Sequence, residues 1–211
     1  MACEQWLVEI KSWQQGIAAI VAFCGLIVAA LYNARLNRKR DERLRQEEVR
    51  SVAAALYGEM CVLRSRAAGI ARQTAAVYIA QGTNGRSTVK IDEHFVRANT
   101  LPEQVLYKAL ASKFGLLPPS LIIQITNFYE NINLVETWLP QMVDDPKSSY
   151  SYNVLHVLNP ALDAVLRVMP ALEQIENIID VPKTERATAL DLGRAEGVAD
   201  GEEEQLRAYA D

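Results

Sequence analysis

The chain has 211 residues, of which 50% are hydrophobic and 23% charged, and its formal net charge at pH 7 is −4. This length allows one modest domain with its own core beside smaller segments. The composition excludes a disulfide-rich scaffold, because the chain has only three cysteines, and Cys3, Cys24 and Cys61 do not have the spacing of a metal site.

The first fifteen residues place Trp6, Ile10 and Trp13 at the spacing of one helical face. This pattern fits a short amphipathic turn that lies on the outer surface of a membrane, and three residues do not favour it over a disordered tail. A disordered tail is the alternative. In both cases we expect residues 1–15 to form a short external segment.

Residues 16–32 contain no charged side chain. A helix of this length covers ~25 Å, close to the lower limit for crossing the hydrocarbon core of a bilayer. Trp13 and Tyr32 flank the stretch, at the places where amphipathic rings prefer to lie. We therefore predict a transmembrane helix at 16–32. The alternative is a buried core helix, but the stretch is apolar on every face rather than on one.

The orientation of this helix follows from the basic residues beside it, which are Arg35, Arg38, Lys39, Arg40, Arg43 and Arg45. Lysine and arginine near the end of a span are retained in the cytoplasm. We expect a single-pass protein of the inner (cytoplasmic) membrane, with the N-terminus outside and the C-terminal domain in the cytoplasm. A cleaved signal is not expected, because Lys11 is the only basic side chain before the apolar stretch.

Two contact surfaces are expected on the N-terminal helix. A possible packing face for a second membrane helix consists of small residues at intervals of four, three and four, namely Ala18, Ala22, Gly25 and Ala29. The alternative is that these residues only reflect an alanine-rich composition. In the Arg-rich juxtamembrane helix predicted at 33–48, four side chains could contact anionic lipid, namely Arg35, Arg38, Lys39 and Arg40. We expect the lipid bilayer as a partner and no nucleic acid.

Apolar residues alternate at intervals of four and three from Val49 to Val77, through Ala53, Leu56, Met60, Leu63, Ala67, Ile70 and Thr74. This heptad pattern fits either a parallel coiled coil between chains or one face of an antiparallel bundle within the chain. The small residues in the pattern and the apolar helices downstream favour the bundle. Gly82 is suited to end the helix, and most of the connection from Gly82 to Asn99 is expected to be loop.

Three further helices are predicted before Pro182. A capping box at Thr100–Glu103 predicts a helix that ends at Gly115, with Val105, Leu106, Leu110 and Phe114 facing inward. A longer helix follows from Ser120 to Leu139, with Leu121, Ile125, Phe128, Ile132, Val135 and Leu139 in the core. Asn159 and Pro160 then resemble the start of a helix that runs to about Asp180 and is kinked at Pro170.

The sequence therefore predicts an all-α protein, in which a transmembrane helix continues into a long helix and then an antiparallel helical bundle at 49–182. Residues 183–211 carry four basic and eight acidic side chains and few large apolar ones. Such a segment buries too little surface to offset the entropy of ordering, so we expect an acidic disordered tail.

A pattern in the middle of the chain resembles one found in uncharacterised single-pass bacterial membrane proteins with a cytoplasmic helical domain. It consists of Leu101-Pro102, Tyr107, Gly115-Leu-Leu-Pro118 and Phe128-Tyr129. The resemblance covers about thirty residues and implies no activity.

The sequence contains no recognisable catalytic, cofactor-binding or metal-binding motif. His94 and His156 are its only histidines, and neither has a ligand partner at helical or hairpin spacing. Asp144 and Asp145 precede a proline, as in a solvated turn, and Tyr107, Tyr129 and Trp138 could line a groove but fit a core as well. We therefore predict a membrane-anchored, non-enzymatic helical protein for interaction or oligomerisation. The alternatives are a regulatory or signalling subunit of a membrane complex and an unrecognised membrane-associated enzyme.

Overall fold

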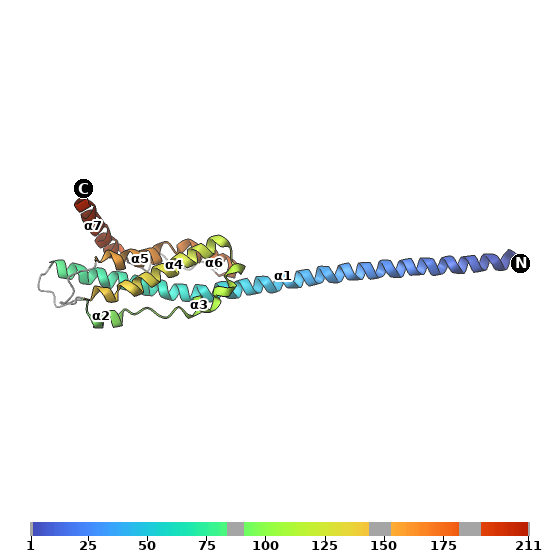
Figure 1. Ribbon diagram of the computed structural model, residues 1–211, viewed down its shortest axis with the longest axis horizontal. Coiled ribbons are helices and arrows are strands. Elements are labelled where there is room, and N and C mark those ends of the chain that lie inside the picture. The colour runs from blue at the N-terminus through green and yellow to red at the C-terminus, as the bar shows by residue number, and fades with distance from the viewer. Residues whose placement is uncertain (1, 84–90, 144–152, 182–190, 211) are drawn as a thin grey trace. The chain divides into compact units, whose positions relative to one another are not determined.

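A computed structural model describes residues 2–83, 91–143, 153–181 and 191–210, and within these ranges every regular element is a helix. The chain is therefore all-α, as predicted. The elements are α1 (Ala2–Thr83), α2 (Glu93–Ala98), α3 (Val105–Leu110), the 3-10 helix η1 (Ala111–Leu116), α4 (Pro119–Trp138), the 3-10 helix η2 (Pro140–Met142), α5 (Leu155–Leu166), α6 (Met169–Ile179) and α7 (Gly193–Ala210) (Figure 1).

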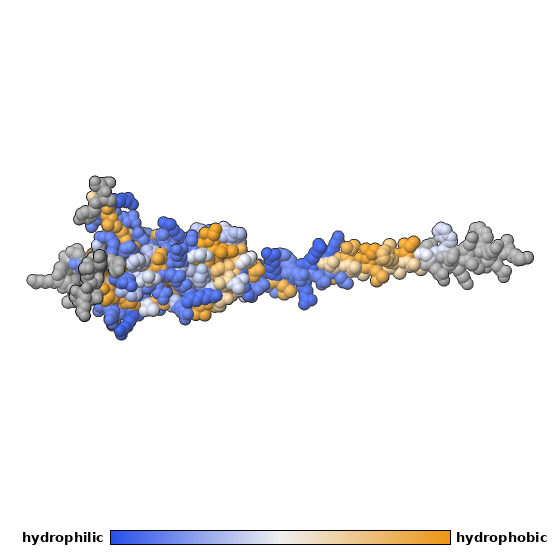
Figure 2. All heavy atoms as spheres, in the orientation of Figure 1, coloured by the Kyte–Doolittle hydropathy of each residue, from blue (hydrophilic) through white to orange (hydrophobic). Residues whose placement is uncertain are grey.

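The chain divides into two compact units, residues 1–48 (unit 1) and 49–211 (unit 2), and helix α1 contributes to both. Unit 1 holds one long apolar stretch near the N-terminus, drawn in orange in Figure 2, which the Arg-rich residues follow in blue. No proline interrupts the chain between 33 and 83, which allows the backbone hydrogen bonds of α1 to continue from one unit into the other.

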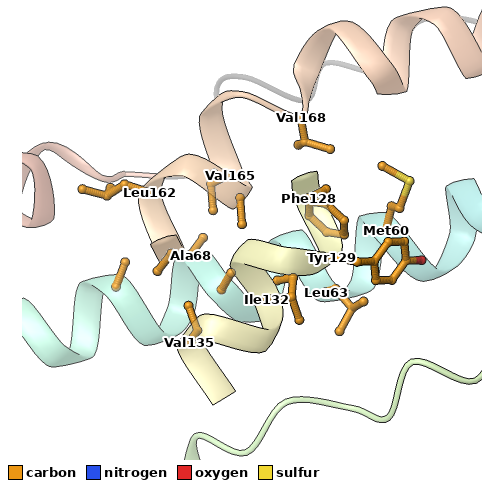
Figure 3. Packing of buried hydrophobic residues seen from close by; sticks show 14 of the residues in the cluster. Met60, Leu63, Ala68, Phe128, Tyr129, Ile132, Val135, Leu162, Val165 and Val168 are labelled. Atoms are coloured by element: carbon orange, nitrogen blue, oxygen red, sulfur yellow. The ribbon is translucent and has the colours of Figure 1, made fainter. Parts of the chain in front are cut away.

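The core of unit 2 confirms the four-three spacing read from the sequence. Helix α1 buries every residue of its predicted seam from Ala53 to Val77, and Val49 packs against the core at its edge. Helix α4 buries all six of its predicted core residues, and it packs against α5. Figure 3 shows side chains of α1, α4 and α5 meeting in one cluster, among them Met60 and Leu63, Phe128 and Ile132, and Val165.

The predicted capping box at Thr100 is wrong. The Thr100 hydroxyl donates instead to the carbonyl oxygens of Val96 and Arg97, both at 3.2 Å, and closes α2, a helix in a region that we expected to be loop. A threonine hydroxyl can bond a carbonyl of the preceding turn as readily as it caps a following helix. Helix α3 begins only at Val105, which is 57% exposed rather than turned inward.

The last predicted helix also differs from the structure. Its N-cap at Asn159 is wrong, because α5 already begins at Leu155, whose N–H donates to Asn153 Oδ1 at 2.8 Å. Pro160 therefore lies inside α5. Pro170 does not kink a continuous helix but lies in the first turn of α6, where a missing N–H costs nothing. As predicted, this part of the chain stops being helical at Asp180, which adopts the left-handed conformation with a φ of 58°.

The prediction that residues 183–211 are disordered is wrong for most of this segment. Residues 182–190 and 211 lie outside the described residues, but Gly193–Ala210 forms helix α7, which packs against α5. Leu192, Ala195 and Ala199 are at most 5% exposed. Two alanines contribute little to a composition-based estimate of burial, yet their small side chains allow α7 to approach the rest of unit 2 closely.

Candidate functional site

The apolar stretch of α1 is exposed in the structure. Ile27 is 44% exposed, and six other large residues have 60% to 70% of their surface accessible, namely Ile20, Val21, Phe23, Leu26, Val28 and Leu31. By length and composition this is the one helix of the described chain that could cross a membrane, and none of its apolar window is buried. A buried core helix would satisfy the same criteria of length and composition, but it would be covered by protein.

Exposure of this size is unfavourable in water. Transfer of one large aliphatic or aromatic side chain out of water contributes about 1.5–3 kcal/mol, and six such side chains lie within twelve residues here. They are distributed around the helix rather than along one stripe, so one partner helix could not cover them all. A surrounding apolar solvent covers such a surface better.

The four small residues of the predicted packing face share one side of α1. With 3.6 residues per turn, Ala18, Ala22, Gly25 and Ala29 fall within about 60° of the helix circumference. All four are exposed, and a Cβ added at Gly25 would meet no atom of the chain within 4 Å. The surface is therefore free for a second helix.

The predicted lipid-contacting cations do not form one face. Arg35, Arg38, Lys39 and Arg40 are all exposed, but their positions extend over about half of the helix circumference. Only some of them could touch one bilayer surface at the same time. Asp41 and Glu42 follow directly in the sequence and reduce the local positive charge.

A polar cluster in unit 2 joins α1, α3 and α4, and the sequence analysis did not find it. The Glu59 carboxylate on α1 accepts hydrogen bonds from the backbone N–H groups of Leu106 at 2.8 Å and Tyr107 at 2.9 Å, and from the Tyr129 hydroxyl of α4 at 2.7 Å. Burial, the hydrogen bond to Glu59 and the negative charge of Glu59 raise the pKa of Tyr129 far above its usual value. The Glu59 carboxylate, 47 residues before Leu106, thus caps the N-terminus of α3, a role that we expected Thr100 to have.

Of the three aromatic side chains that could have lined a groove, only Tyr129 lies fully in the core. The Tyr107 and Tyr129 rings stack with centroids 3.9 Å apart. Trp138 stacks on His156 at 4.5 Å. Tyr107 and Trp138 are half-buried and pack against the core at its edge.

A second polar cluster holds α7. The Tyr78 hydroxyl of α1 donates to Glu202, and the Asn159 and Asn153 side-chain amides donate to Glu203 at 3.0 Å and Glu202 at 3.4 Å. Partial burial, the hydrogen bond to Glu202 and its charge raise the pKa of Tyr78 to about 12. Because these partners are far from α7 in sequence, no local pattern could have revealed the contacts.

The described residues hold no group of three or more histidine, cysteine or acidic side chains that could bind a metal ion. His94 is exposed on α2 and belongs to no such group, and Asp144 and Asp145 lie outside the described residues. In comparisons with known proteins, no family model, no curated protein and no solved structure matches the chain.

Proposed function

We propose that this protein is a single-pass membrane protein whose N-terminal helix anchors a helical interaction domain to the bilayer. The observation that carries the proposal is the complete exposure of the apolar window of α1. Lipid tails would cover all sides of this stretch, which no single protein face could do. The span is close to 16–32, and residues 1–15 lie outside.

The proposed orientation places unit 2 in the cytoplasm. Six basic residues follow the span between 35 and 45, whereas only Lys11 and the amino terminus precede it. This asymmetry retains the C-terminal side in the cytoplasm during insertion. The Arg-rich helix at 33–48 then lies next to the inner leaflet, where some of its cations can contact anionic headgroups.

Unit 2 acts as a non-enzymatic module for binding a partner protein or a second copy, and its helices form an antiparallel bundle. The single extended core that the helices of unit 2 share supports the bundle. The small-residue face at Ala18–Ala29 offers a place where two anchors can meet. The resemblance to uncharacterised single-pass membrane proteins agrees with this architecture.

Two leucine variants test the anchor in the full-length chain. Leu26 and Leu44 are 70% and 55% exposed on the same helix, but only Leu26 lies within the apolar stretch. Arginine at the centre of a span costs about 2.5–3.5 kcal/mol of insertion free energy. Leu26→Arg should therefore shift much of the protein from the alkali-resistant membrane fraction to the soluble fraction, and Leu44→Arg should not. Equal distribution of both variants and the parent would contradict the proposed anchor.

A reporter fused after Asp211 tests the orientation. A reporter that is active only in the cytoplasm should work, and one that is active only after export should not. The opposite result, or a mature chain that lacks the first ~34 residues, would contradict the assigned topology.

A further inference from the structure

Helix α7 buries fewer residues than the other long helices of unit 2, α4, α5 and α6. In this segment only Leu192, Ala195 and Ala199 are buried, and two of these are alanines. Helix α5, against which α7 packs, buries eight of its twelve residues. Hence α7 contributes little to the apolar core, and its loss exposes little large apolar surface of its own.

Among the described residues, the hydrogen bonds between α7 and the body of unit 2 have the same direction. The body of unit 2 supplies donors, which are the Tyr78 hydroxyl and the side-chain amides of Asn153 and Asn159. Helix α7 supplies acceptors, which are the carboxylates of Glu202 and Glu203. The surface beneath α7 is therefore complementary to an acidic helix.

A hollow that is open to solvent lies along the junction of α5 and α7. It has a volume of about 420 Å³ and is lined on α5 by Asn159, Leu162 and Leu166 and on α7 by Ala199 and Glu203, together with several charged side chains. A larger side chain in place of Ala199 could enter this space and contact the two leucines.

We propose that α7 is a detachable cover, and that the surface beneath it binds an acidic amphipathic helix of a partner protein in place of α7. This surface, which we call the α7 groove, is formed by α5 together with Tyr78 of α1 and Asn153. Opening detaches α7 and leaves the core of α1, α4, α5 and α6 folded.

The contacts of α7 define the helix that the groove accepts. Small or medium apolar residues stand at intervals of three and four, as at positions 192, 195 and 199, and two carboxylates follow one turn later, as at Glu202 and Glu203. A partner with leucine at the position of Ala199 fills part of the hollow and competes better than α7 itself. Burial of the additional apolar carbons of leucine should tighten binding by roughly tenfold or more.

Amide hydrogen exchange of the full-length protein in nanodiscs tests whether α7 opens separately. The amides of α7 should exchange at least about a hundredfold faster than those of α4 and α5. Tyr78→Phe removes one donor to a carboxylate and should accelerate exchange in α7 by about tenfold, without an effect on α4.

The matched control for this experiment is Tyr57→Phe. Tyr57 is on the same helix and donates to Glu176 of α6 at 2.6 Å, a bond that does not involve α7. The Tyr57→Phe variant should therefore leave hydrogen exchange in α7 unchanged. If α7 is protected as strongly as α4, or if Tyr78→Phe accelerates exchange in all helices equally, α7 belongs to the cooperative core and the proposal is wrong.

A binding experiment tests the groove itself. A labelled peptide of residues 191–211 is added to a chain of residues 1–191, which keeps the anchor and the body of unit 2 but lacks α7. We expect saturable binding, about tenfold weaker binding when Glu202 and Glu203 are both glutamine, and roughly tenfold tighter binding with Ala199→Leu. A truncated chain that loses the helical signal of its core, or that binds all three peptides equally, would overturn the proposal. So would cross-linking of α7 to α5 between two differently tagged intact chains, which would assign the groove to a second copy.

Discussion

Replacement of Glu59 should destabilise unit 2 although Glu59 is only half-buried. Glu59→Ala leaves three donors without their acceptor, namely the N–H groups of Leu106 and Tyr107 and the hydroxyl of Tyr129. The Leu106 N–H is exposed and can bond to water, but Tyr129 is completely buried. An unsatisfied buried donor costs about 1–3 kcal/mol, so the expected loss is about 2–4 kcal/mol of unfolding free energy.

Thermal unfolding of residues 49–211, followed by circular dichroism, measures this loss. For a unit of this size, 1 kcal/mol corresponds to about 2–4 °C, so Glu59→Ala should lower the Tm by roughly 5–15 °C. Tyr129→Phe removes one of the three bonds and should cost about 1–2 kcal/mol in the parent, but much less in the Glu59→Ala background. Glu136→Ala on the exposed side of α4 is the control and should change the Tm by less than about 2 °C. If Glu59→Ala and Glu136→Ala melt alike, the carboxylate does not hold α3 and the reasoning fails.

Three other outcomes are expected. Residues 49–211 should fold without the anchor, with mainly helical circular dichroism and one cooperative melt; a spectrum dominated by β-structure would contradict this. In a membrane association assay on residues 1–50, Gly25→Ile should weaken self-association by ~1 kcal/mol or more, while Ile20→Leu should leave it unchanged; equal signals would mean that the small face is composition rather than interface. The protonated Tyr78 is stabilised in the fold, so its contribution is complete below pH 10 and is lost as the pH rises through about 12; the Tm of residues 49–211 should fall more over that interval than the Tm of Tyr78→Phe, and an equal fall in both would contradict the contact with Glu202.

The buried faces of the long helices were predictable because apolar periodicity decides which side of a helix avoids water. Leu56 and Met60 on α1, and Ile125 and Ile132 on α4, occupy the positions that the four-three spacing assigns to a core, and all four are fully buried. The exposed apolar stretch was predictable for a similar reason, since a stretch without a polar side has no face to turn toward water.

The short helices were not predictable, because long-range partners decide where they begin. Thr100 has the local pattern of a cap, but the carboxylate of Glu59 fixes the start of α3 from a different helix. Helix α7 is a similar case. Its sequence has too few large apolar residues for a core helix, and its contacts with Tyr78 and Asn159 join positions 124 and 44 residues apart.

The structure also restricts how two copies could meet. The seam of α1 could in principle have formed a coiled coil between chains, but Leu56, Met60 and Leu63 are fully buried in the core that they share with α4 and α5 of the same chain (Figure 3). Continued toward the N-terminus, the same four-three spacing reaches Gln46, Glu42, Lys39 and Arg35, which are polar and exposed. The seam therefore has no apolar continuation through 33–48, and charged side chains at such positions do not hold two helices together. If two copies associate, the surfaces that remain are the small residues of the exposed apolar stretch and the outer surface of unit 2, and the Gly25→Ile variant tests the first of these.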